Sequence, residues 1–174
     1  MEIRAISGDI TKVSLPAIIV NLFEGVKQPG GATGAVDRAL DGAITQLIAD
    51  GELKGKLNEV ALLHTLGRIP AARVAIVGLG KQAEFTLDRV RQVSCTAVRY
   101  LRGKGVTRAA TIVHGAGIGG LDASAAAQAL AEGTLLGLYK FKKHKSPRAT
   151  EPEEKDLDEL LIVEQDDSRV PTLE

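Results

Sequence analysis

The hydrophobic positions of the chain alternate between short continuous runs and longer runs with helical spacing. Continuous apolar runs rich in β-branched residues are typical of strands covered on both faces of a sheet, and they occupy residues 2–6, 17–22, 59–66, 73–78 and 109–113. Apolar residues that recur every three or four positions predict helices, at residues 34–50, 86–102 and 122–139. This order predicts an α/β fold with a mixed, largely parallel sheet between helix layers.

The ends of the predicted helices carry residues that commonly cap helices. Gly51 stands where a left-handed cap would follow the first helix, and Gly103 or Gly105 would close the second. Asp122 precedes the third helix and is expected to cap its N-terminus. These signals agree with the three helices that the periodicity predicts.

The chain changes character after residue 139. Residues 140–148 are basic, residues 149–158 are polar and acidic, and each block contains a proline, as is typical of a tether that leaves a domain. The sequence therefore predicts a domain at residues 1–145 and a linker at residues 146–174. Within the linker, the apolar residues 160–163 would add an edge strand, and residues 166–174 are expected to be disordered.

The composition narrows the function classes. Apolar residues make up 44% and charged residues 25% of the 174 residues, which is ordinary for one globular domain. Twenty-two basic side chains balance 22 acidic ones and only 3% of the residues are aromatic, so nucleic acid is not an expected partner. No apolar stretch approaches the roughly 18 residues of a membrane helix, and residues 1–4 lack the hydrophobic region expected of a secretory signal. We expect a cytoplasmic protein with no membrane partner.

The first candidate ligand-binding segment is Gly8-Asp9-Ile10, directly after the first predicted strand. The carboxyl ends of parallel strands are where α/β folds bind ligands. Asp9 would accept a hydrogen bond from an adenine amino group, and Gly8 would permit close approach of the backbone. The alternative, which the spacing alone favours, is a plain turn in which Asp9 binds its own backbone.

Two glycine-rich segments precede predicted helices. One holds Gly115, Gly117 and Gly119, and the other holds Gly30 and Gly31. Free backbone N–H groups beside a helix N-terminus bind phosphate. The first segment lacks the spacing of the dinucleotide-binding fingerprint, and a tight crossover from strand to helix explains it equally well. The second segment is either another wall of the same pocket or a flexible loop.

No segment predicts a catalytic or metal-binding residue. His64, His114 and His144 have no potential ligand two to four residues away. Cys95, which is the lone cysteine, lies in an apolar helical stretch and is expected to be a small buried hydrophobic residue. Residues 78–81, GLGK, lack the leading glycine and the following Ser or Thr of a phosphate-binding P-loop.

Two longer stretches are more distinctive. Residues 73–91 read RVAIVGLGKQAEFTLDRVR, and residues 132–146 read EGTLLGLYKFKKHKS. They resemble the N-terminal domain of the leucyl aminopeptidases, also called cytosol aminopeptidases. In that family a V-G-L-G-K strand end precedes a helix, and an E-G-x-x-L-x-x-Y helix leads towards the catalytic domain. The likeness covers residues 1–165.

This resemblance implies a non-catalytic role for the chain. The family's two-metal centre lies in a C-terminal catalytic domain, in stretches such as N-T-D-A-E-G-R that the chain lacks. Two manganese or zinc ions are expected there, where they activate water, and no cofactor is expected here. The parent enzyme would release N-terminal residues, preferably Leu, from peptides. The expected partners are the chain's own catalytic domain and the sister subunits of a homohexamer, with a role in assembly or in access to the active site.

The first third of the chain also resembles the macro domain, the ADP-ribose-binding fold, through residues 8–11, 17–21 and 30–31. Both resemblances imply a three-layer macro-like sandwich. Residues 22–24, Leu-Phe-Glu, replace an A-A-N stretch whose Asn contacts the distal ribose in that family, so we expect a degenerate pocket. The alternative function is a binding module for ADP-ribose or a related nucleotide. Its candidate residues are Gly8, Asp9, Ile10, Gly30, Gly31, Gly115, Gly117 and Gly119.

Overall fold

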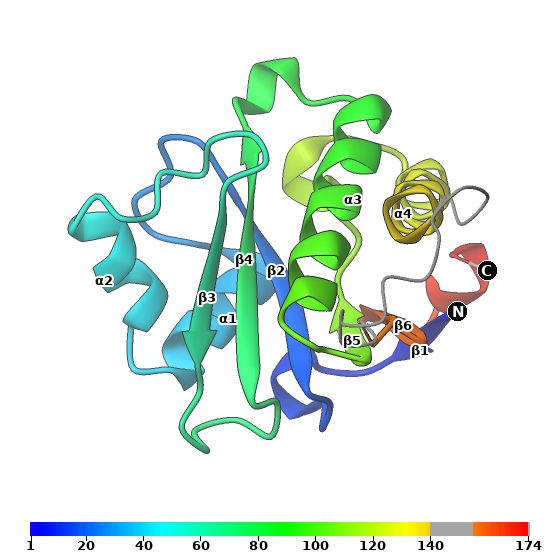
Figure 1. Cartoon of the computed structure of the whole chain (residues 1–174). Coiled ribbons are helices and arrows are strands. Elements are labelled where there is room, and N and C mark those ends of the chain that lie inside the picture. Colours follow the sequence, from blue (N-terminus) through cyan, green and yellow to red (C-terminus); the bar gives the residue numbers. More distant parts are fainter. Residues whose placement is uncertain (140–154, 174) are drawn as a thin grey trace, which may run out of the picture.

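A six-stranded sheet with helices on both faces forms the framework of the molecule (Figure 1). The computed structural model describes residues 1–139 and 155–173. The strands are β1 (Glu2–Ser7), β2 (Ala17–Phe23), β3 (Val60–His64), β4 (Arg73–Gly80), β5 (Arg108–Thr111) and β6 (Glu159–Glu164). The α-helices are α1 (Gly31–Ala39), α2 (Ala43–Ala49), α3 (Leu87–Gly103) and α4 (Ala123–Leu138). Short 3₁₀ turns are η1 (Ile10–Lys12), η2 (Gln82–Glu84), η3 (Gly117–Gly119) and η4 (Val170–Thr172).

The parallel strands of the sheet end side by side, and a ligand site is expected where the carboxyl ends of such strands meet. The order is β1-β6-β5-β2-β4-β3, and every neighbouring pair is parallel except β3 with β4. The carboxyl ends of β1, β6, β5, β2 and β4 therefore share one edge. The predicted α/β class with a mixed, largely parallel sheet is confirmed.

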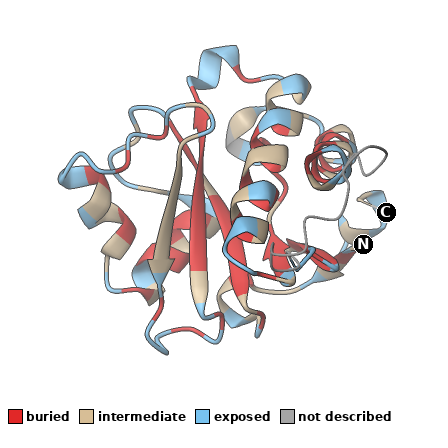
Figure 2. Ribbon diagram, viewed as in Figure 1, coloured by how far each residue is buried: buried red, intermediate tan, exposed pale blue. Residues whose placement is uncertain are grey.

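Alternating side chains of the central strands build two separate cores. Ala17 and Ile19 of β2 belong to the core beneath α3 and α4. Ile18 and Val20 of the same strand belong to the core beneath α1 and α2. Successive side chains of a strand point to opposite faces, so a strand covered on both faces is apolar throughout. Figure 2 shows β2 and β4 buried along most of their length.

The prediction of an edge strand at residues 160–163 is wrong in its position. β6 lies between β1 and β5 and pairs with both in parallel; Leu160, for example, is opposite Ile3 and Ala109. Every residue of β6 except Glu164 is buried, because both faces of this strand are covered. Part of the segment expected to be a linker therefore belongs to the sheet.

The single helix predicted at residues 34–50 is two helices. Asp37 near the end of α1 explains the break, because its buried carboxylate caps α2. Oδ1 accepts hydrogen bonds from the backbone N–H groups of Ile44 and Thr45 at 2.7 and 3.0 Å. The first N–H groups of a helix have no partner within it, so a side-chain acceptor stabilises that end. Gly42 adopts a left-handed conformation at φ 81° where the chain turns.

The predicted caps are in place. Gly51 follows α2 with φ 76°, and Gly105 follows α3 with φ 71°. Asp122 accepts a hydrogen bond from the backbone N–H of Ala125 at 2.9 Å and so begins α4. Glycine is suited to the two left-handed positions because it has no Cβ.

The disorder predicted for residues 166–174 is not found in the described part, 166–173. η4 packs against β1, and Leu173 packs against the core beneath α3 and α4. The hydroxyl of Ser7 donates a hydrogen bond to the carboxylate of Asp167. The basic block 140–148 and residues 149–154 lie outside the described residues, so the structure does not bear on the role predicted for them.

Two glycines of α4 set its distance from α3, beside which it lies in Figure 1. A Cβ atom on Gly133 would lie 2.3 Å from the carbonyl oxygen of Arg91, and one on Gly137 would lie 2.9 Å from Cα of Cys95. Contacts this short do not occur between real atoms, so only glycine fits both positions at this separation.

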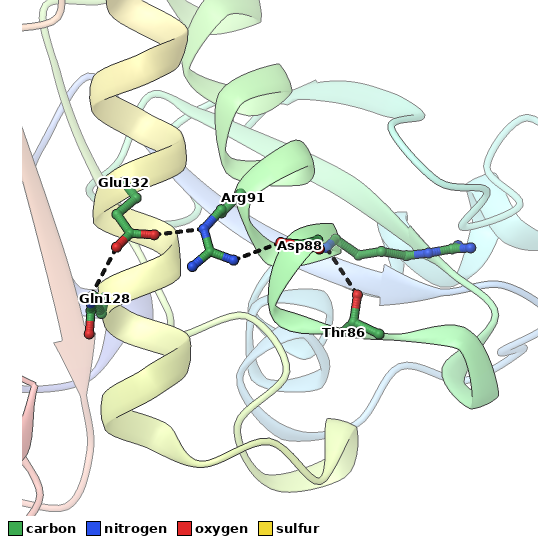
Figure 3. Close-up of polar contacts among 6 residues, drawn as sticks. Thr86, Asp88, Arg91, Gln128 and Glu132 are labelled. Atoms are coloured by element: carbon green, nitrogen blue, oxygen red, sulfur yellow. Dashed lines mark hydrogen bonds and ion pairs between the residues drawn. The ribbon is translucent and has the colours of Figure 1, made fainter.

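A polar network joins the same two helices at the surface (Figure 3). Arg91 Nε lies 2.6 Å from Glu132 Oε2, and Arg91 Nη1 lies 2.8 Å from Asp88 Oδ1. Gln128 donates a further hydrogen bond to Glu132 at 3.0 Å. The hydrogen bond from Arg91 lowers the pKa of the Glu132 carboxyl. Glu132 and Gly133, the first two residues of the EGTLLGLY stretch, thus both serve the contact between α3 and α4.

Candidate functional site

Two adjoining hollows lie at the edge of the sheet where the parallel strands end. The Asp9 hollow has a volume of about 210 Å³ and the Phe23 hollow about 220 Å³. Both are lined by Ala32, Ile112, Val113, Ala116 and Gly117. The Asp9 hollow is also lined by Gly8, Asp9, Ile10, Ala35, Val163, Glu164, Gln165 and Arg169. The Phe23 hollow is also lined by Asn21, Phe23, Gly30, Gly31, Thr33, Gly115 and Gly119.

The structure brings all eight predicted binding residues to these two hollows. The three residues after β1 line the Asp9 hollow. The glycines at the start of α1 and after β5 line the Phe23 hollow, and Gly117 lines both. They gather because parallel strands present their carboxyl ends, and the loops that follow them, on one edge. That these residues bind a ligand remains a prediction.

Asp9 performs the structural role that sequence reasoning held as the alternative. Its Oδ1 accepts hydrogen bonds from the backbone N–H of Thr11 at 2.9 Å and from the Thr11 hydroxyl at 2.7 Å. These bonds, the side-chain one first, lower the pKa of the Asp9 carboxyl, so Asp9 is ionised at neutral pH. Both bonds use Oδ1, and Oδ2 takes part in neither. The Asp9 hollow therefore has an anionic carboxylate in its wall.

The loop after β5 rests on two aromatic rings. Phe23 and Phe85 meet edge to face, with ring centroids 5.1 Å apart. Gly115 has φ 85°, and a Cβ atom there would lie 2.4 Å from Cε1 of Phe85. Both the left-handed backbone conformation and the close contact therefore require glycine at this position. A Cβ atom on Gly119 would lie 3.5 Å from Cζ of Phe23, which is an ordinary contact. The Phe23 ring thus lies in the wall of the second hollow, while Glu24 is exposed and lines neither hollow.

Asn21 lines the Phe23 hollow and is hydrogen-bonded to His114. Sequence reasoning did not select either residue for this contact. Asn21 Nδ2 lies 3.1 Å from Nδ1 of His114, which is 1% exposed. Burial lowers the pKa of His114 to about 4, so the ring is neutral at neutral pH and Nδ1 accepts the bond. The hydroxyl of Thr33 in α1 donates to the carbonyl oxygen of Asn21 at 2.7 Å. Strand β2, helix α1 and the loop after β5 are therefore joined at one residue.

The C-terminal segment supplies a wall that sequence reasoning also missed. Glu164, Gln165 and Arg169 line the Asp9 hollow, although residues 166–174 were expected to be disordered. The backbone N–H of Gly8 donates to the carbonyl oxygen of Glu164 at 2.9 Å and fixes this wall beside the loop after β1. The signal for it was the apolar run of β6, which carries the chain to this edge.

The GLGK stretch has a structural purpose. A Cβ atom on Gly78 would lie 1.9 Å from the carbonyl oxygen of Lys56, because the loop before β3 crosses over the end of β4. The P-loop was excluded on spacing, and the glycine is explained by this close approach.

Among the described residues no three His, Cys, Asp or Glu side chains gather in a way that could hold a metal ion. His64 is exposed on β3 and His114 is buried beside Asn21, while His144 lies outside the described residues. Within the same ranges, none of the helices has the length and apolar character needed to cross a membrane.

The family model for the N-terminal domain of the cytosol aminopeptidase family matches residues 19–148. The chain belongs to the cytosol aminopeptidase family. This result confirms the resemblance read from residues 73–91 and 132–146, and it assigns the chain to the N-terminal part of family members.

Curated relatives agree with that assignment. A probable cytosol aminopeptidase of Geobacter sulfurreducens is 40% identical over 150 residues, which are 86% of this chain and 30% of the relative. One of Alkaliphilus metalliredigens is 36% identical over 95% of this chain and 33% of its own. The chain thus spans about a third of the length of these cytosol aminopeptidases.

Solved structures confirm the macro-like sandwich. A mutant tomato leucine aminopeptidase superposes with a TM-score of 0.73 at 18% identity, over 95% of this chain and 33% of its own. The Trypanosoma brucei macrodomain in complex with ADP-ribose gives 0.73 at 20% identity, over 98% and 67%. An Oceanobacillus iheyensis macrodomain mutant gives 0.74 at 14%, over 97% and 87%. At these identities the likeness shows the fold alone, which the aminopeptidase N-terminal domain shares with macrodomains.

Proposed function

We propose that this chain is the non-catalytic N-terminal domain of a longer, metal-dependent aminopeptidase that releases N-terminal residues, preferably Leu, from peptides in the cytoplasm. The carrying observation is the share of the relatives that the chain covers: it matches probable cytosol aminopeptidases over only about a third of their length. The two manganese or zinc ions of the reaction would then be held by the remaining two thirds.

A role in assembly is supported by an apolar surface at the end of α4. Leu135, Leu136 and the following Tyr139 are 53%, 69% and 72% exposed. Exposed groups of large apolar side chains mark surfaces that pack against other protein. We propose that this end of α4 contacts the catalytic domain or a sister subunit of a homohexamer, and so helps to shape access to the active site.

The first experiment assays the purified chain on leucine p-nitroanilide with added Mn²⁺ or Zn²⁺. We expect no release of p-nitroaniline. Hydrolysis in proportion to the amount of pure chain would contradict the non-catalytic role.

A second experiment tests the assembly role in a chimera, in which this chain replaces the matching residues of the Geobacter sulfurreducens relative. The chimera is expected to hydrolyse the anilide and to elute as a large oligomer. Leu136→Asp should reduce oligomer size and activity. Leu66→Asp is the matched control, because Leu66 is 85% exposed on the turn between β3 and β4, away from α4. Equal effects of the two substitutions would refute the assembly role.

A second candidate function is binding of ADP-ribose or a related nucleotide. The observation in its favour is the clustering of the eight predicted residues at the two adjoining hollows, beside the N-terminus of α1, which no side chain caps. Such a ligand would have to span both hollows and pass over Phe23. Calorimetric titration with ADP-ribose tests this candidate, and no heat at millimolar ligand would dismiss it.

A further inference from the structure

The Asp9 hollow has the size of a small molecule. Its volume of about 210 Å³ lies below the roughly 300–1,000 Å³ that is usual for sites of drug-sized ligands. The Phe23 ring lines the neighbouring hollow and not this one, although five residues line both hollows. A ligand confined to the Asp9 hollow is therefore much smaller than a dinucleotide.

The same hollow presents both signs of charge. Asp9 contributes a carboxylate whose Oδ2 is not used by Thr11. Glu164 also lines the hollow, and its carboxylate accepts a hydrogen bond from the backbone N–H of Asp166 through Oε1 at 3.1 Å, a bond that does not use Oε2. Arg169 contributes a guanidinium, which contacts Asp166 through Nε at 3.4 Å. That ion pair does not use the two terminal nitrogens. Their N–H groups are spaced so that both can donate to the two oxygens of one ligand carboxylate.

Apart from Gln165 and two glycines, the remaining wall is apolar. Ile10, Val113 and Val163 are 4%, 7% and 4% exposed, and Ile112 and Ala35 complete this side. Burying an apolar side chain of a ligand against such a wall is favourable because it removes apolar surface from water. A ligand that matches all three features carries a cation, an anion and a short hydrocarbon group.

We propose that the Asp9 hollow binds a free α-amino acid with an apolar side chain, its ammonium group at Asp9 and Glu164 and its carboxylate at Arg169. The inference rests on the proposed function in one respect: a free amino acid is what an aminopeptidase releases, so the hollow would let the product occupy a site in a domain without catalytic residues. Binding is reversible and involves no covalent step.

The test is a calorimetric titration of the 174-residue chain with L-leucine, leucinamide and N-acetyl-leucine. Leucinamide keeps the ammonium group and removes the carboxylate, whereas N-acetyl-leucine does the reverse. We expect saturable binding of L-leucine and at least a tenfold loss of affinity with either analogue. Absence of heat from L-leucine at concentrations up to about 20 mM, where millimolar affinity would be evident, overturns the proposal. Equal affinity for all three compounds overturns it as well.

Two variants locate the site. Asp9→Asn removes the charge but keeps a side chain that caps η1, and Arg169→Gln removes the guanidinium. Each is expected to weaken L-leucine binding at least tenfold. The matched controls are Asp122→Asn at the N-cap of α4 and Arg99→Gln on the exposed side of α3, neither of which lines the hollow. Controls that weaken binding as much as the site variants would refute the placement, and unfolding temperatures measured on all four detect any loss of fold.

ADP-ribose, titrated in parallel, separates the possible failures. If ADP-ribose binds and L-leucine does not, the amino-acid inference is overturned and the nucleotide candidate is supported. The aminopeptidase assignment is tested independently by the chimera, so an active chimera without leucine binding overturns only this inference.

Discussion

Gly133 is the position at which the packing of α3 on α4 is most open to test. Replacing it with Ala adds one methyl group, whose carbon would lie 2.3 Å from the carbonyl oxygen of Arg91 and 2.7 Å from its Cα. Both neighbours are backbone atoms, so no side chain can rotate away. The helices must separate until these distances exceed 3.0 Å, below which real Cβ contacts essentially do not occur.

Two opposing effects set the magnitude. Overpacking a well-packed core costs about 1–3 kcal/mol, and here the separation also loosens the contact at Gly137. Against this, Ala is favoured over Gly in a helix by about 1 kcal/mol. Because both neighbours are backbone atoms that cannot rotate away, we expect an overpacking cost of about 2–3 kcal/mol, which leaves a net loss of about 1–2 kcal/mol. For a chain of this length that corresponds to a fall in unfolding temperature of about 2–8 °C.

The assay is thermal unfolding followed by circular dichroism, with Gly103→Ala as the matched control. Gly103 is the last residue of α3 and a Cβ atom there meets nothing within 4 Å. The control therefore gains helix propensity without a clash and should unfold at or above the temperature of the unmodified chain. If Gly133→Ala is as stable as the unmodified chain, the argument that glycine sets the helix separation is refuted.

Three further predictions concern stability. Burial lowers the pKa of His114 from 6.5 to about 4. Above pH 6.5 the ring is therefore neutral in both the folded and the unfolded protein. As the pH falls from 6.5 towards 4, only the unfolded protein takes up the proton, so the free energy of unfolding falls by up to about 3 kcal/mol. His114→Phe should flatten that pH dependence in urea titrations, and an unchanged slope would contradict the assignment. Asp37→Ala should lower the free energy of unfolding in urea by about 0.5–2 kcal/mol, because it removes the cap of α2. Asp50→Ala, at the other end of α2, should lower it by less. Ile162→Ala should cost about 2–5 kcal/mol because β6 lies inside the sheet, and a loss below 1 kcal/mol would instead indicate a loosely held edge strand.

The sequence predicted most elements because their local signals were strong. β2 and β4 are apolar on both faces, and α3 has a regular apolar stripe between Thr86, which caps it, and Gly105. In these segments local preference and tertiary environment favour the same structure. The errors occurred where a contact distant in sequence decides the outcome. Asp37 breaks a helix that periodicity alone would continue, and the position of β6 depends on a strand at the other end of the chain.

The candidate site likewise contains residues that the sequence predicts and residues that only the fold brings there. The eight predicted residues lie at the hollows because each follows a strand or precedes a helix, which is visible in sequence. Arg169, Glu164 and the pair of Asn21 with His114 join them only through the folded arrangement of β1, β6 and β5. No local pattern marks such residues, since the partners that give them a role are far away in the chain.

The central claim, that the chain is a domain of a longer aminopeptidase, is tested most directly by the size of the native protein. Extracts of the source cells would be fractionated by gel filtration, blotted with an antibody raised against this chain, and assayed for leucine p-nitroanilide hydrolysis. The account predicts a band about three times as long as this chain, in line with its share of the relatives, in the fractions that hydrolyse the anilide. A single band near 18.3 kDa, eluting apart from that activity, would contradict it.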